Sequence, residues 1–196
     1  MSAALDTLLD QGRLWRGHAP RKANTLSTGH PALDAMLPGG GWPRGALSEV
    51  LHAAPGSGEL RLVLPLLARL SQQRRPIALI APPLVPYAPG WAQAGVDLTQ
   101  LVVIEAPAGR VIDSACQLLQ AGAAVVCFWA RRLNETDTRR MTLAAETAQA
   151  VAVWMRDAAA QGIPSTAALR IAVRGNTADI LKVRGGRPEH GCLLAA

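Results

Sequence analysis

The chain has 196 residues, of which 49% are hydrophobic and 17% are charged, and its formal net charge at pH 7 is +6. This length is typical of one domain, and this composition supplies a substantial core and excludes disorder over most of the chain. The N-terminus lacks a basic segment followed by an apolar one, and no apolar run approaches the ~20 residues of a membrane span. We therefore expect a cytoplasmic protein with no signal peptide and no membrane contact.

Charge and cysteine content narrow the candidate partners and ligands. Only Lys22 and Lys182 are lysines among the 20 basic residues, and arginine is the better residue for gripping phosphate and carboxylate groups. This bias indicates either contact with nucleic acid or an acidic partner, or arginines spread over a solvated surface. The spacing of the three cysteines matches no zinc-binding motif, and no metal site is expected.

The N-terminal part of the chain carries few strong signals. Residues 3–11 are predicted to form a short helix, because their leucines fall near one face. Trp15, which follows in a short segment, is a candidate anchor for a partner. A second short helix is expected over residues 31–37, with Ser27 or Thr28 as its N-terminal cap.

Apolar runs alternate with helical segments through the middle of the chain. The predicted strands cover residues 46–51, 77–81, 101–105 and 123–129. The predicted helices cover residues 60–73 and 109–121, with one or two helical turns at 90–94. This alternation of short, continuous apolar strands with helices is typical of an α/β protein with a mostly parallel sheet.

The clearest predicted helix covers residues 137–160, with Asp137 or Thr138 as its cap. Its apolar face is expected to contain Leu143, Val151, Trp154 and Ala158. Two strands follow, over residues 169–173 and 180–184, and their side chains alternate in polarity. We expect these two strands to pair as an antiparallel edge of the sheet.

The most informative motif is a glycine-rich turn between the first predicted strand and the helix after it. Its residues are Pro55, Gly56, Ser57, Gly58, Glu59 and Leu60. In this setting the backbone N–H groups of a turn cradle phosphate, while a lysine and then a serine or threonine bind the phosphates and magnesium. Glu59 and Leu60 take those two places here. The motif therefore predicts a degenerate phosphate loop, in which Glu59 repels phosphate and favourably meets the dipole of the helix.

Three segments together carry a family resemblance: PGGGWPRG at residues 38–45, PGSGE at 55–59 and LKVRGGRP at 181–188. They resemble ImuA, a family of small RecA-like proteins of bacterial operons for translesion DNA synthesis. The resemblance implies an α/β, RecA-like core with a mostly parallel central sheet flanked by helices and with antiparallel strands at its C-terminal edge. We expect this core over residues 27–190, after a partner-binding N-terminal segment at 1–26 and before a tail at 191–196.

The departures from catalytic RecA proteins agree with one another. Besides Glu59 and Leu60, the acidic residue expected after the second strand corresponds to Pro83. The fourth strand ends at Trp129 with no aspartate to bind magnesium. Phosphoryl transfer depends on all of these elements. The resemblance therefore implies a protein that is not an enzyme and needs no cofactor.

The ImuA resemblance implies an adaptor in SOS-inducible translesion synthesis. Its partners would be the polymerase-like protein ImuB, with RecA, an error-prone polymerase, single-stranded DNA or a second copy of the chain as further candidates. Two alternatives stay open. One is a cell-division inhibitor that resembles SulA and binds FtsZ, and the other is a DNA-stimulated ATPase that binds nucleotide at the glycine-rich turn.

Arginines supply the candidate contacts with DNA or a partner. They are Arg131, Arg132, Arg139, Arg140, Arg184 and Arg187. The first four flank the loop after the fourth predicted strand. The alternative interpretation is that they pair with Glu135, Asp137 and Glu146 on their own surface.

Overall fold

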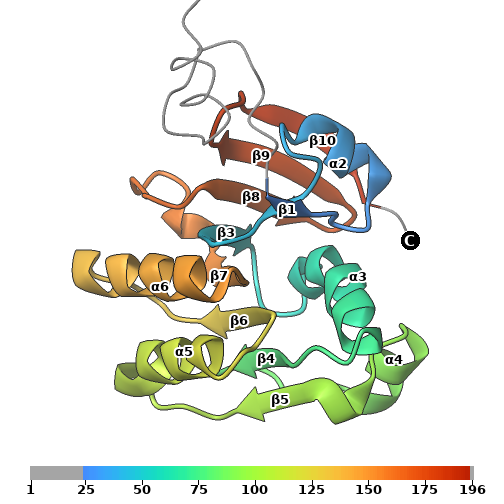
Figure 1. Cartoon of the computed structure of the whole chain (residues 1–196). Coiled ribbons are helices and arrows are strands. Elements are labelled where there is room, and N and C mark those ends of the chain that lie inside the picture. The colour runs from blue at the N-terminus through green and yellow to red at the C-terminus, as the bar shows by residue number, and fades with distance from the viewer. Residues whose placement is uncertain (1–23, 195–196) are drawn as a thin grey trace, which may run out of the picture.

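The centre of the molecule is built from short strands, and those in the middle of the sheet are apolar and largely buried on both faces. In the computed structural model, which describes residues 24–194, eight of them make one sheet (Figure 1). They are β3 (Ala46–His52), β4 (Ile77–Ile80), β5 (Leu101–Ile104), β6 (Val125–Trp129), β7 (Val151–Asp157), β8 (Leu169–Arg174), β9 (Thr177–Val183) and β10 (Glu189–Leu193). Their order is β10-β9-β8-β3-β7-β6-β4-β5. Strands β3 to β8 run parallel, and β9 and β10 add antiparallel strands at one side, so the predicted fold class is confirmed.

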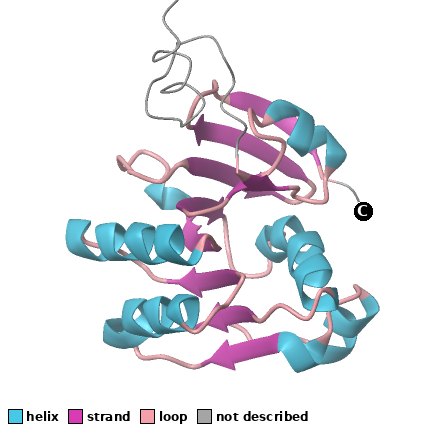
Figure 2. Cartoon of the chain, viewed as in Figure 1, coloured by secondary structure: helices cyan, strands magenta, loops and turns pink. Residues whose placement is uncertain are grey.

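Helices cover both faces of this sheet (Figure 2). One face carries α3 (Glu59–Gln72) and α4 (Ala88–Gln93), and the other carries α5 (Val111–Gln120) and α6 (Glu135–Ala148). The short helix α2 (Pro31–Met36) packs beside β10. Each face has its own hydrophobic cluster, with Leu62 and Leu66 of α3 in one and Met141 and Ala145 of α6 in the other. None of the helices within residues 24–194 is long and apolar enough to cross a membrane.

Small elements complete the described part of the chain. Strands β1 (Thr25–Leu26) and β2 (Trp42–Pro43) form a separate two-stranded sheet. Single turns of 3₁₀ helix occupy Leu98–Gln100, Ala108–Arg110 and Ala158–Ala160. The helix predicted over residues 3–11 and Trp15 lie outside the described residues, so both remain predictions.

The predicted helix over residues 137–160 is wrong in its second half. Helix α6 ends at Ala148, because Gln149 adopts a left-handed backbone conformation with φ of 48°. The chain then enters β7, which pairs with β3 on one side and β6 on the other. Periodicity does not distinguish a fully buried strand from a buried helical segment, and pairing on both sides decides in favour of the strand.

The apolar face predicted for that helix is consequently also wrong. Leu143 is 64% exposed on α6. Val151 and Trp154 are an odd number of positions apart on β7, so their side chains enter the clusters on opposite faces of the sheet. Ala158 lies beyond β7, in a 3₁₀ turn. These four residues therefore share no common face.

The predicted helix caps are also corrected. Helix α6 is capped by Asn134, whose side chain accepts a hydrogen bond from the Asp137 backbone at 2.7 Å. Ser27 and Thr28 do not cap α2, which begins after His30. Instead, the Ser27 hydroxyl and the Thr28 backbone N–H both donate to the carboxylate of Asp34, at 2.6 and 2.8 Å.

The C-terminal strands extend further than predicted. Strand β9 does pair antiparallel with β8, but it is an interior strand, because β10 pairs along its other side. Residues 191–193, expected to belong to a tail, form the end of β10. The period-2 pattern misses β10 because four of its five residues are exposed.

Candidate functional site

The glycine-rich turn lies where β3 leads into α3, at the carboxyl end of the parallel strands (Figure 1). Gly56 and Gly58 have φ values of 79° and 113°, which L-residues with a side chain rarely adopt. A Cβ atom at position 58 would also lie 2.6 Å from the carbonyl oxygen of Gly175. The backbone conformation of the turn and its close packing against the turn between β8 and β9 therefore require glycine at position 58, and the backbone conformation favours it at position 56.

Glu59 is buried in this turn rather than exposed to solvent. Its side chain is part of the first turn of α3, and the residue is only 1% exposed. One carboxylate oxygen, Oε1, accepts a hydrogen bond from the backbone N–H of Gly56 at 2.8 Å. The carboxylate therefore lies at the positive end of the helix dipole and satisfies an N–H group of the turn.

The position that binds magnesium in a working phosphate loop offers no ligand here. Leu60, at the place of the magnesium-binding serine or threonine, is partly buried against the core on the α3 side. The hydroxyl of Ser57 accepts a hydrogen bond from the backbone N–H of Ala54 at 3.4 Å, within the turn. Across residues 24–194, no three His, Cys, Asp or Glu side chains come close enough together to hold a metal ion.

Two of the predicted arginines form ion pairs on their own surface. Arg139 lies 2.7 Å from Glu135, and Arg140 lies 2.7 Å from Asp113 and 3.9 Å from Asp137. The hydrogen bond from Arg140 lowers the pKa of Asp113, and the same bond raises the pKa of Arg140. These two arginines are therefore partnered by carboxylates, one of which, Asp113, the sequence does not suggest.

Of the other predicted arginines, only Arg184 shares a hollow with a member of this pair. Arg131 and Arg132 follow β6 and are exposed, and within the described residues they form no hydrogen bond or ion pair. Arg184 lines a hollow of about 400 Å³ together with Arg139 and two glutamates of α6. Arg187 is exposed in the turn between β9 and β10. The structure therefore brings Arg139 and Arg184 together at one hollow, and Arg131, Arg132 and Arg187 do not line it.

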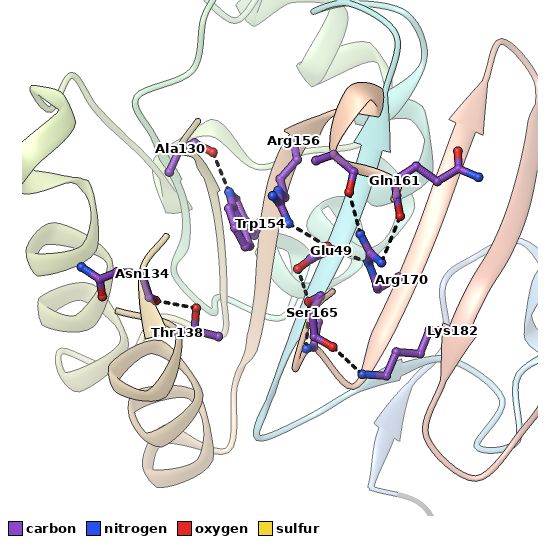
Figure 3. A network of polar contacts seen from close by, with 12 residues as sticks. Glu49, Ala130, Asn134, Thr138, Trp154, Arg156, Gln161, Ser165, Arg170 and Lys182 are labelled. Atoms are coloured by element: carbon purple, nitrogen blue, oxygen red, sulfur yellow. Dashed lines mark hydrogen bonds and ion pairs between the residues drawn. The ribbon is translucent and has the colours of Figure 1, made fainter. Parts of the chain in front are cut away.

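A buried charge cluster that the sequence does not reveal connects β3, β7 and β8 (Figure 3). Glu49 is fully buried on β3, and its Oε2 accepts from Arg170 at 2.8 Å and from Arg156 at 3.3 Å. The hydroxyl of Ser165 donates to the other oxygen, Oε1. Arg170 also donates to the carbonyl of Ala160 at 3.1 Å. The cluster therefore fixes the connection between β7 and β8 onto the sheet.

Aromatic side chains extend this cluster toward β6. The guanidinium of Arg156 lies 3.8 Å from the centroid of the Trp154 ring, which stacks on Phe128 at 6.5 Å. The indole N–H of Trp154 donates to the carbonyl of Ala130 at 2.7 Å. The only signal for this arrangement in the sequence is the presence of charged residues inside otherwise apolar strands.

Comparisons with known proteins relate this site to two groups. A family model described as cell division inhibitor SulA matches residues 45–152, from the residue before β3 to the second residue of β7. Protein RecA of Chlorobium limicola is 27% identical over 169 residues, which are 73% of this chain and 47% of that protein. The chain thus spans about half the length of the curated relative it matches. The crystal structure of SulA from Pseudomonas aeruginosa is 24% identical with a TM-score of 0.47, covering 56% of this chain and 97% of that chain.

Proposed function

Because the chain belongs to the family of the cell division inhibitor SulA, we propose that it is a non-catalytic, RecA-like binding protein of the DNA-damage response. The observation that carries this proposal is the buried carboxylate of Glu59 at the start of α3. A triphosphate entering the turn would meet a negative charge and would have to displace the hydrogen bond to Gly56. We therefore expect this turn not to bind a nucleotide.

The specific role we propose is that of an adaptor in SOS-inducible translesion synthesis, with an ImuB-like protein as its partner. The match to the SulA family ends at residue 152, whereas this fold continues through β8, β9 and β10. Two of the three segments that resemble ImuA lie mostly or wholly outside that match, at residues 38–45 and 181–188. RecA, an error-prone polymerase or a second copy of the chain are further proposed partners.

A second candidate function is inhibition of cell division through binding to FtsZ. It is favoured by the name of the family that matches residues 45–152. The two candidates share a nucleotide-free α/β platform and differ in the partner that it binds. They can therefore be separated by the identity of the partner alone.

Co-purification tests which partner the chain binds. The full chain, tagged at its C-terminus, is mixed in separate experiments with purified ImuB-like protein and with FtsZ. An adaptor of translesion synthesis is expected to retain the ImuB-like protein through gel filtration and to leave FtsZ polymerisation unchanged. Retention of FtsZ with loss of its polymerisation would instead establish the second candidate and remove the first.

Direct contact with single-stranded DNA is a further part of the proposal. Arg131 and Arg132 are its best candidates, because they are exposed and not engaged by carboxylates of the described residues. The wild-type chain is expected to bind an oligonucleotide with an affinity that falls steeply with salt. The double variant Arg131→Ala, Arg132→Ala should weaken this binding, whereas Arg139→Ala, which removes an arginine paired with Glu135, should change it little. Equal binding by all three proteins would exclude Arg131 and Arg132 from the contact.

A further inference from the structure

We propose that Glu59 is a resident anion, that is, a carboxylate of the chain itself that fills the place a phosphate group would take in this turn. The turn and α3 are then held in their ligand-occupied shape without any nucleotide. This inference rests on the proposed function, since it explains how a RecA-like binding protein keeps its platform formed when no nucleotide is present.

The geometry of the turn supports an occupied anion site. Gly58 precedes α3 and has no side chain that could cap the helix, and Glu59 is the only acidic residue in its first turn. The Glu59 side chain folds back to the N–H of Gly56, three residues earlier, instead of extending into solvent. Backbone N–H groups of a glycine turn and of a helix N-terminus together form a concave surface that binds anions.

Burial distinguishes Glu59 from an ordinary, exposed helix cap. The second oxygen of Glu59, Oε2, is buried and has no hydrogen-bond partner among the described residues. Burying a carboxylate is costly unless the surroundings favour negative charge. Helix α6 also has 14 residues, but its N-terminus is capped by the neutral, exposed side chain of Asn134. The first turn of α3 therefore holds a buried acidic side chain, whereas α6 has an exposed amide cap.

The turn and the start of α3 also lie beside neighbouring loops that reach the surface. A Cβ atom at position 56 would lie 3.7 Å from the Leu84 side chain, so the turn borders the loop after β4. This loop exposes Leu84, Val85 and Tyr87, which are 60%, 88% and 72% accessible. On the other side, Arg61 of α3 donates a hydrogen bond to Asn176 in the turn between β8 and β9. A permanently filled turn would keep both loops in place.

The test replaces the resident carboxylate and supplies a free anion. Glu59→Ala should lower the melting temperature by about 2–6 °C, the effect of losing a helix cap in a chain of this size. Pyrophosphate should restore at least half of that loss, compared with sodium chloride at equal ionic strength, and should give a saturable heat on titration. The wild-type chain should show neither effect. Asn134→Ala is the matched control, because it removes the cap of α6 and creates no anion site.

Three outcomes would overturn the inference. The first is that pyrophosphate does not raise the melting temperature of Glu59→Ala, and the second is that it raises that of Asn134→Ala equally. The third is that the wild-type chain binds pyrophosphate. If Glu59→Ala does not fold alone, refolding from urea decides, since the inference requires recovery in pyrophosphate and none in chloride. Failure of the proposed function is a separate result, because it requires the wild-type chain to bind Mg-ATP, which none of these three outcomes involves.

Discussion

Glu49 and Glu59 are both carboxylates that the fold removes from water, and they differ in how their charge is balanced. Glu59 relies on backbone dipoles at the start of α3, whereas Glu49 is balanced by Arg156 and Arg170. Removing one member of a buried ionic group is costly, because it leaves the remaining charges uncompensated. The two sites therefore make separate predictions for stability.

Neutralising Glu49 is expected to destabilise the protein strongly. Glu49→Gln keeps the shape of the side chain but leaves Arg156 and Arg170 buried without a negative partner. The free energy of unfolding should fall by about 3–5 kcal/mol, as measured by urea denaturation. The control is Glu135→Gln, which breaks the exposed pair with Arg139 and should leave stability unchanged within error. Similar midpoints for the two variants would show that the Glu49 cluster does not fix the connection between β7 and β8.

At the residue scale, the sequence predicts Glu59 but not the Glu49 cluster. Glu59 lies within a local motif whose spacing defines the chemistry expected at each position. The partners of Glu49 are separated from it by 107 to 121 positions in the chain. Only the order of the strands brings them together, so no local pattern in the sequence identifies them.

At the scale of elements, the position of β7 at the centre of the sheet leads to a testable prediction. It lies between β3 and β6 and is buried along six of its seven residues. Its amide hydrogens should therefore exchange only when the whole sheet opens, as slowly as those of β3. Native-state hydrogen exchange measures this directly. Fast exchange over residues 152–155, comparable with that of the exposed residues of α6, would contradict a central strand.

The sequence predicts most of the other elements because each carries a local signal. Strands β3, β4, β5 and β6 appear as short apolar runs bounded by turns, and α3 and α5 show helical periodicity. Strand β7 lacks a boundary that the pattern can detect, since Gln149 ends α6 without a glycine or proline. Strand β10 is visible only through its pairing with β9, because its own residues are mostly exposed.

At the scale of the whole molecule, the chain has a RecA-like α/β arrangement in which Glu59 and Leu60 alter the glycine-rich turn. The parallel strands bring the turn, the apolar loop after β4 and the loop with Arg131 and Arg132 to the same edge of the sheet. In a nucleotide-driven protein, loops at this edge respond to the bound phosphate. Here the turn is closed by Glu59, and we expect the edge to be available to a partner at all times.

The measurement that tests this account most directly is a calorimetric titration of the wild-type chain with Mg-ATP, followed by an assay for released phosphate with and without single-stranded DNA. The account predicts no heat beyond dilution, no shift of the melting temperature and no phosphate release, because Glu59 occupies the turn and Leu60 offers no ligand for magnesium. A saturable heat or measurable turnover of ATP would contradict it.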